Sequence, residues 1–125
     1  RLYESGKTKM IGISNVTAEQ LTLLCQRAAH KPMVVQNRCY AALGWDQDVR
    51  TVCRTHGIIY QGFSLLTANR ELFADPEVRA MAAKYGMGLA QLVFRFAMKH
   101  MQEDLRSDQF TIAPDDLQRL EIIGM

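Results

Sequence analysis

Short apolar segments that end on polar residues alternate along this chain with amphipathic segments of helical period. The apolar segments are Met10–Ser14, Met33–Arg38 and Ile58–Ser64, and each is continuously apolar at its start. Such a run is typical of a strand that is buried on both faces of a parallel sheet. Because parallel strands need helical crossovers between them, the alternation predicts an α/β fold with about three parallel strands.

Helix signals occupy the segments between and after these strands. Thr17 followed by Gln20 has the pattern of a capping box. Asp46–His56 is a second amphipathic segment, and Gly57 is expected to stop it in a left-handed conformation. Residues 1–6 are expected to be the end of a helix that stops at Gly6. The remaining helices are expected after the Asp75-Pro76 cap, over Leu89 to about Lys99, and from Pro114 onward.

Length and composition are those of an ordinary globular protein. The 125 residues, of which 48% are hydrophobic, are expected to form a single domain over residues 1–125. The net charge of +2 comes from residues spread along the chain, which predicts neither a nucleic-acid partner nor a membrane surface. No apolar run reaches the ~20 residues of a membrane helix, and no charged leader opens the chain, so a cytoplasmic protein is expected.

Cysteines and histidines are few and scattered. They are Cys25, Cys39, Cys53, His30, His56 and His100. An odd number of cysteines without Cys-x-x-Cys spacing predicts reduced thiols in a core, and the separated histidines predict no metal site. The chain starts at Arg1 rather than Met, as a fragment or a processed chain would.

Polar side chains follow the predicted strands at the edge where α/β proteins collect small-molecule sites. Ser14 and Asn15 come directly after the first strand and are the first candidates for ligand contact, although Ser and Asn also cap helices. Gln36 lies near the end of the second strand, where the alternative is a buried amide bonded to backbone. Phe63 ends the third strand, where the alternative is a core position.

Six motifs, in order and in register, resemble the second half of the aldo/keto reductase family. They cover nearly the whole chain and are Gly12-Ile-Ser-Asn15, Thr17–Leu21, Val35-Gln-Asn37, His56–Leu65, Ala82–Gly86 with Ala90–Phe96, and Thr111–Asp115. Each motif is weak by itself, and the common register carries the resemblance. It implies the later strands of a (β/α)8 barrel of the TIM type, from an enzyme that reduces carbonyl compounds with NADPH.

The resemblance implies a nicotinamide site. Ser14, Asn15 and Gln36 match side chains that hydrogen-bond the nicotinamide carboxamide and so fix which face of the ring presents its hydride. Phe63 stands where the family has an aromatic ring stacked on the nicotinamide.

The resemblance also implies contacts with the rest of NADP(H). Ser64, Leu65 and Leu66 begin the loop that the family folds over the pyrophosphate. Glu103 and Asp104 match an acidic residue and an amide at the adenine end, although Asp104 departs from the more usual Asn. Without the resemblance, both would be a solvated helix start.

Two parts of the family pattern have no counterpart here. The family's catalytic Asp, Tyr, Lys and His lie on earlier strands, so no catalytic residue is predicted in this chain. The family's last strand and phosphate-gripping loop would fall between His100 and Met101. A truncation is favoured there over an omitted segment, because a buried central strand is seldom disordered.

These observations predict an NADP(H)-dependent carbonyl reductase, with this chain as its nicotinamide-binding half. The alternatives are a non-catalytic half barrel that dimerises and binds nucleotide, and a part of a longer enzyme. Three parallel strands leave two unpaired edges and an uncovered inner face. We therefore expect association with a second copy or with a complementary first-half chain, and a small carbonyl compound as substrate.

Overall fold

The computed structural model describes residues 1–101 and 113–122 of the chain. The chain divides into two compact units. Unit 1 holds residues 1–38 and 46–63, and unit 2 holds residues 39–45 and 64–125.

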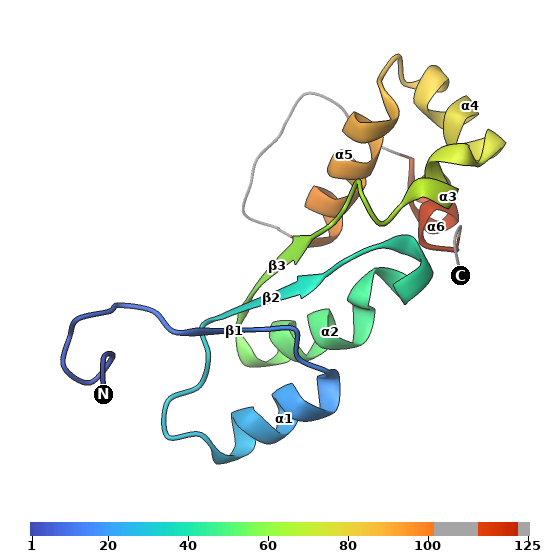
Figure 1. Ribbon diagram of the computed structural model, residues 1–125. Coiled ribbons are helices and arrows are strands. Elements are labelled where there is room, and N and C mark those ends of the chain that lie inside the picture. The colour runs from blue at the N-terminus through green and yellow to red at the C-terminus, as the bar shows by residue number, and fades with distance from the viewer. Residues whose placement is uncertain (102–112, 123–125) are drawn as a thin grey trace. The chain divides into compact units, whose positions relative to one another are not determined.

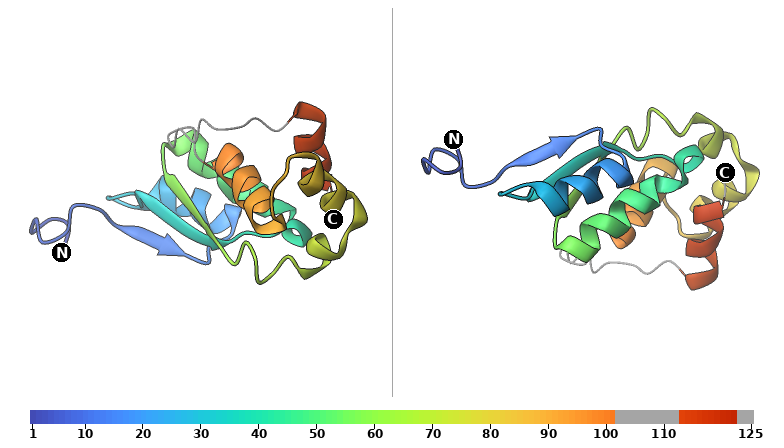
Figure 2. Two further views of the ribbon diagram at one scale, coloured as in Figure 1. Left: turned by 90° about the horizontal axis from the view of Figure 1, so that it is seen from above. Right: turned by 90° about the horizontal axis from the view of Figure 1, so that it is seen from below.

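Unit 1 is a parallel sheet with helices on one face. The strands are β1 (Gly12–Ser14), β2 (Val34–Arg38) and β3 (Ile59–Phe63), which pair in parallel in the order β1-β2-β3. Helices α1 (Ala18–Arg27) and α2 (Gln47–His56) both lie on the same side of these strands (Figures 1 and 2). The predicted α/β fold with three parallel strands is confirmed, with strands that begin one or two residues later than expected.

The start of α1 is built as the sequence predicts. The Thr17 hydroxyl accepts a hydrogen bond from the Gln20 N–H at 3.2 Å, and Gln20 Oε1 accepts one from the Thr17 N–H at 3.0 Å. This reciprocal pair satisfies two amide groups that the first turn of a helix leaves without backbone partners. The position of the helix start is therefore fixed by two residues within one turn.

The core of unit 1 lies between the sheet and its two helices. Leu21, Val35, Val49 and Cys53 are almost completely buried there. Burial raises the pKa of the Cys53 thiol to about 11, and the nearby Asp46 and Cys25 add to this shift. All three cysteines are buried and outside any disulfide bond, as predicted. A buried neutral thiol of this kind is part of the packing and is a poor nucleophile.

Residues 1–6 form only a turn, so the predicted helix end there is wrong. The Ser5 N–H donates to the Arg1 carbonyl at 2.9 Å, and Gly6 then takes a left-handed φ of 70°. The Gly6 stop is where the sequence places it. A single helical turn gains little, because helix nucleation is unfavourable without packing to support it.

Unit 2 is helical, and two of its short elements were not predicted. It holds α3 (Arg70–Ala74), α4 (Pro76–Lys84), α5 (Leu89–Met101), α6 (Pro114–Ile122) and, up to Trp45, the 3-10 segment η1 (Ala41–Asp46). The Asp75 carboxylate accepts from the Glu77 and Val78 N–H groups at 2.7 and 3.3 Å, which confirms the predicted cap of α4. None of the described helices in either unit is long and apolar enough to cross a membrane.

Trp45 is among the largest fully buried side chains of the described chain and belongs to unit 2. Its ring is 1% exposed and lies 4.7 Å from the Phe96 ring, centroid to centroid. Its Nε1–H donates to the Leu120 carbonyl at 3.1 Å, so the one polar group of the buried indole is satisfied. The backbone of Trp45 is left-handed, with a φ of 56°. This burial and hydrogen bond offset a conformation that is unfavourable for a residue with a Cβ.

A carboxylate joins two helices of unit 2. Asp116 Oδ2 on α6 accepts from Lys84 Nζ at 2.6 Å and from the Tyr85 hydroxyl at 2.7 Å. The Tyr85 hydroxyl also accepts from the Ala113 N–H at 3.0 Å. The hydrogen bonds from Lys84 and Tyr85 lower the pKa of Asp116 below its ordinary value.

Thr17→Ala is expected to lower the free energy of unfolding by about 1 kcal/mol, because the helix loses its capping hydroxyl. Urea denaturation followed by circular dichroism measures this change. Thr22→Ala is the control, since the Thr22 hydroxyl bonds to the Ala18 carbonyl inside the same helix and caps no helix end. Equal destabilisation by both substitutions would contradict the role of the capping box.

Asp116→Asn is expected to reduce the loss of stability in acid. Because the pKa of Asp116 is lowered on folding, its contribution is fully present above the ordinary value of 3.8. It is lost as the pH falls through the lower value of the folded state. The variant should therefore be less stable than wild type at neutral pH and lose less stability on acidification below a pH of about 4. Thermal unfolding across this range is the measurement, and a variant that loses stability in acid as steeply as wild type would contradict this role of Asp116.

Candidate functional site

The face of the sheet that α1 and α2 leave open carries a row of polar side chains. Ser14, Gln36 and Gln61 occupy equivalent positions on β1, β2 and β3, because Ser14 pairs with Gln36 and Gln36 pairs with Gln61. All three side chains are exposed. Successive residues of a strand point to opposite faces, so these side chains point away from the buried Val35 and Tyr60.

Hydrogen bonds connect the row across the three strands. The Ser14 hydroxyl donates to the Gln36 carbonyl at 2.7 Å, and Gln36 Nε2 donates to Gln61 Oε1 at 3.1 Å. The predicted pair of Ser14 and Gln36 is thus brought together. The alternative of a buried amide at Gln36 does not apply, because the side chain is exposed and bonds to another side chain.

Phe63 lies one step further toward the carboxyl ends of the strands. It pairs with Arg38 of β2 and is half-buried, so it is not a closed core position. The Arg38 guanidinium carbon lies 5.9 Å from the centre of the Phe63 ring, within the range of a cation–π contact. An aromatic surface and a fixed positive charge therefore border the polar row.

Asn15 begins the turn between β1 and α1 in a strained conformation. Its φ is 54°, in the left-handed region, and its N–H donates to the Gln36 carbonyl at 3.1 Å. The same carbonyl also accepts from the Ser14 hydroxyl. Non-glycine residues in this region often lie at functional sites, and here the strained residue directly follows the polar row.

The predicted phosphate-loop residues belong to unit 2. Ser64 is left-handed with a φ of 64°, and its carbonyl accepts from the Ala68 N–H at 3.1 Å. Leu65 and Leu66 follow in this turn, and all three residues are half-buried. The two remaining predicted contacts, Glu103 and Asp104, lie outside the described residues.

Sequence reasoning missed two residues of this face. Gln61 completes the polar row, and Arg38 lies against Phe63. Both could have been found from the period of two in a strand, because they lie two residues from Phe63 and Gln36 respectively. The prediction considered residues at the ends of strands, whereas Gln61 lies in the middle of β3.

The chemistry of this face fits a carboxamide. A carboxamide offers one acceptor oxygen and two N–H donors, and it needs both kinds of partner. The Ser14 hydroxyl and the Gln36 and Gln61 amides can each donate and accept, and their mutual hydrogen bonds use only part of that capacity. The half-buried Phe63 ring adds a flat apolar surface beside them. These residues therefore suit a planar ring that carries an amide.

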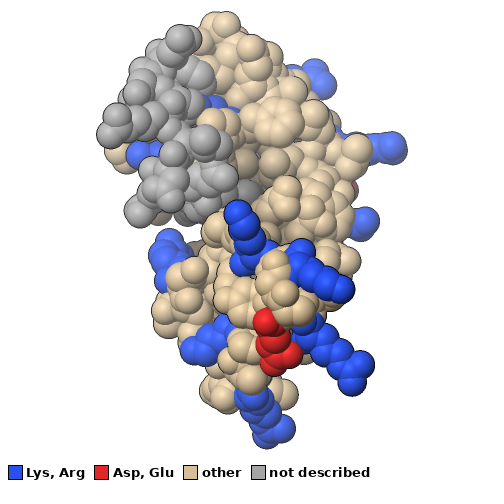
Figure 3. Space-filling model, turned by 90° about the vertical axis from the view of Figure 1, so that its left-hand side faces the viewer, with Lys and Arg blue, Asp and Glu red and all other residues tan. Residues whose placement is uncertain are grey.

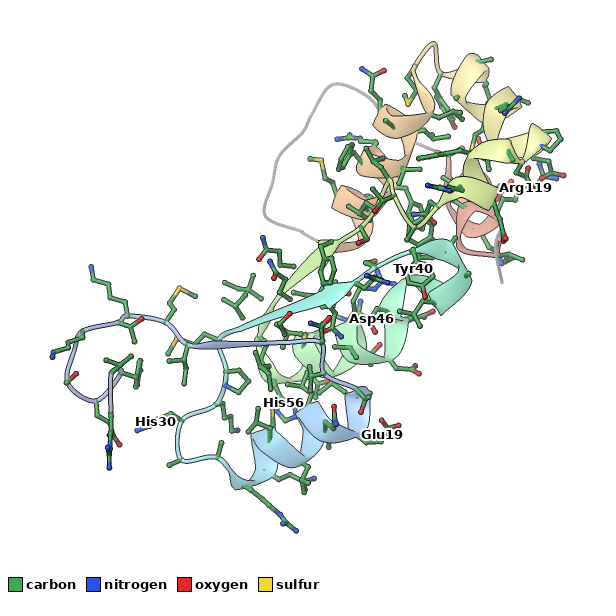
Figure 4. The ribbon with its side chains drawn as sticks, viewed as in Figure 1. Glu19, His30, Tyr40, Asp46, His56 and Arg119 are labelled. Atoms are coloured by element: carbon green, nitrogen blue, oxygen red, sulfur yellow. The ribbon has the colours of Figure 1, made fainter. Side chains whose placement is uncertain are left out.

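Metal ligation has no candidate in the part of the chain that the structure describes. No three His, Cys, Asp or Glu side chains come together there to hold an ion. Figure 4 shows His30 and His56 on separate segments. On the face drawn in Figure 3, the Lys and Arg side chains stand as separate groups among other residues. The exposed sheet face is thus the candidate site that the described residues support.

Comparison with known proteins gives consistent matches. The sequence profile of the Aldo/keto reductase family matches residues 1–114. "Aldo-keto reductase family 1 member A1" of Xenopus tropicalis is 31% identical over 79% of this chain and 33% of its own length. "Glyoxal reductase" of Bacillus subtilis is 30% identical over 80% of this chain and 36% of its own length.

A solved aldo-keto reductase of the silkworm, in complex with NADPH, has the same fold. It superposes with a TM-score of 0.82 at 19% identity, over 99% of this chain and 45% of its own. This chain therefore spans about a third to a half of the length of the proteins that it matches. With the profile covering all but its last residues, the chain belongs to the aldo/keto reductase family.

Proposed function

We propose that this chain is the nicotinamide-binding half of an NADP(H)-dependent carbonyl reductase. The observation that carries the proposal is the polar row on the open sheet face, in which Ser14 and Gln36 are joined by a 2.7 Å hydrogen bond next to the strained Asn15. These are the residues at which the family resemblance expects the carboxamide contacts. The silkworm relative solved with NADPH supports the same cofactor.

In this proposal each residue has a defined role. Bound NADPH supplies the hydride that reduces a carbonyl carbon. Ser14, Asn15 and Gln36 hold the carboxamide and so fix the face of the nicotinamide ring, while Phe63 offers the surface on which that ring lies.

We also propose contacts for the parts of the cofactor beyond the nicotinamide ring. Ser64, Leu65 and Leu66 contact the pyrophosphate, and Glu103 and Asp104 contact the adenine end. The three buried thiols fit the reducing conditions of the cytoplasm, where we expect the protein to act.

The catalytic proton must come from outside the matched half. Reduction of a carbonyl needs an acid at its oxygen as the hydride arrives. The family's Tyr, Lys, Asp and His lie on its earlier strands, to which no residue of this chain corresponds. We therefore assign the acid, and most of the pocket for a small carbonyl substrate, to the complementary half of the barrel.

The same complementary half is the partner that we propose for the open face of the sheet. Ile59 on this face is 53% exposed, and Val34 beside it is half-buried. Apolar side chains in such a position favour association. The chain has about half the length of a family barrel, so the missing strands of one barrel match the uncovered face.

Gln36→Leu is expected to weaken NADPH binding about tenfold, because the carboxamide loses a hydrogen-bond partner in the site. Titration followed by nicotinamide fluorescence measures the dissociation constant. Gln26→Leu, which changes an exposed glutamine on α1, is the matched control and should bind like wild type. A wild-type chain that does not bind NADPH, or a Gln36→Leu variant that binds equally well, would contradict the proposed site.

Mixing this chain with the first half of the Bacillus subtilis glyoxal reductase should produce a one-to-one complex. The complex, and neither half alone, should oxidise NADPH with a nitrobenzaldehyde, because only the complex unites the acid with the nicotinamide site. Light scattering and absorbance measure the two outcomes.

Ile59→Lys should prevent this complex by placing a charge on the covered face. Leu23→Lys, at a 45% exposed position of α1, is its control and should leave the complex intact. A stable homodimer of this chain would instead identify a second copy as the cover and favour the non-catalytic alternative. A monomer both alone and in the mixture would also contradict the proposal.

A further inference from the structure

Two turns that carry candidate cofactor contacts share one backbone feature. Asn15, after β1, and Ser64, after β3, have φ values of 54° and 64°. Both residues have a Cβ, which makes the left-handed region unfavourable unless other contacts hold the backbone there. The residues that directly follow, Val16 and Leu65, show what holds it.

In unit 1 the side chain of Asn37 clamps the turn after β1. Its Oδ1 accepts from the Val16 N–H at 3.0 Å, and its Nδ2 donates to the Val16 carbonyl at 2.7 Å. One side-chain amide therefore bonds both backbone polar groups of one residue. This fixes the peptide plane on each side of Val16, and with it the position of the preceding Asn15.

A second pair of contacts orients the Asn37 amide. Its Nδ2 also donates to Asp46 Oδ2 at 2.9 Å, and the Tyr60 hydroxyl donates to the same oxygen at 2.7 Å. An ionised carboxylate only accepts hydrogen bonds, so Asp46 holds the NH₂ group on its side. Asp46, labelled in Figure 4, lies at the start of α2 and gives no capping bond to that helix. Its carboxylate instead accepts the hydrogen bond from the Asn37 side-chain amide.

In unit 2 the side chain of Asn69 holds the turn after β3 through one backbone group of Leu65, its carbonyl. Its Nδ2 donates to the Leu65 carbonyl at 2.5 Å, and its Oδ1 accepts from the Ala41 N–H at 2.8 Å. Leu65 follows the left-handed Ser64 as Val16 follows Asn15. The two clamps lie in different units, and each bonds the residue that follows a left-handed one: Asn37 bonds both backbone groups of Val16, and Asn69 bonds the carbonyl of Leu65.

Burial sets these two asparagines apart from the other polar residues. Among the described residues, the buried polar or charged side chains are Asn37 at 6% exposure, Asn69 at 2% and Asp116 at 9%. Two of these three hold the residue that follows a strained one. A buried amide is favourable only when it is fully bonded, so each clamp resists loosening of its turn.

We propose that Asn37 and Asn69 are positioning residues that hold the turns after β1 and β3 ready for the dinucleotide. The inference rests on the proposed function, because it assigns these turns to the nicotinamide and the pyrophosphate. The two asparagines contact no ligand themselves. They act through Val16 and Leu65, so that binding does not have to order the turns.

Asn37→Asp and Asn69→Asp test the proposal, because each replaces an NH₂ donor with an oxygen that faces a carbonyl. We expect the dissociation constant for NADPH to rise about tenfold in each variant. We also expect amide hydrogen exchange to become faster at residues 15–17 in the first variant and at residues 64–66 in the second. Where either variant does not fold, Asn37→Ser or Asn69→Ser takes its place, since serine adds no charge but is too short for the clamp.

Val49→Ala and Val78→Ala are the controls, because they remove buried side chains of unit 1 and unit 2 that no clamp uses. They should lower stability and leave NADPH binding unchanged, which separates a positioning role from general destabilisation. Wild-type binding that persists unchanged in both asparagine variants, or unchanged amide exchange at the turns, overturns this inference alone. A wild-type chain that does not bind NADPH overturns the proposed function and this inference with it.

Discussion

The register of three parallel strands determines which side chains meet in this protein. Ser14, Gln36 and Gln61 form one row only because their strands pair at these positions. A slip of one residue would turn this row toward the helices and would expose Val35, which is completely buried. The burial of one face therefore specifies the polar pattern of the other. The candidate site is a consequence of how the core packs.

Adjacent residues of β2 serve these two faces separately. Gln36 lies on the open face, where its side chain bonds to Gln61, while Asn37 lies on the helix side, where it holds Val16. The Gln36 carbonyl also accepts from Asn15. The turn after β1 is thus tied to β2 by both backbone and side chain. Functional loops need such support because they lack the regular hydrogen bonds of helices and strands.

The sequence predicted the features that depend on neighbouring residues. The capping box of Thr17 and Gln20 and the Asp75 cap each lie within one turn, so a local pattern identifies them. The short elements α3 and η1 were not predicted, because tertiary contacts stabilise them. Asn69 bonds to the first residue of η1, and Trp45 near the other end of η1 packs on Phe96. Such contacts leave no periodic signal.

In the candidate site, too, local features were predicted and contacts between distant residues were not. Ser14 was a candidate because it directly follows a strand of an α/β fold, and Gln36 and Phe63 became candidates through the resemblance to the aldo/keto reductase family. The role of Asn37 was not predicted, since its bonds to Val16 join residues 21 positions apart. Asp46 was expected only as the beginning of a helix, and its bond to Tyr60 could not be read from spacing. Side chains that act through a distant backbone group require the fold to be known.

The open face also restricts what can cover it. Along the strands it changes from an apolar level, where Val34 pairs with Ile59, to the polar level of Gln36 and Gln61. A uniformly apolar cover would leave the remaining donors and acceptors of the two amides buried without partners, which is unfavourable. The cover must therefore be apolar toward the amino ends of the strands and polar, or occupied by a polar ligand, toward their carboxyl ends. In the proposed function, the partner that covers this face and the ligand that binds there must therefore satisfy its polar and apolar groups together.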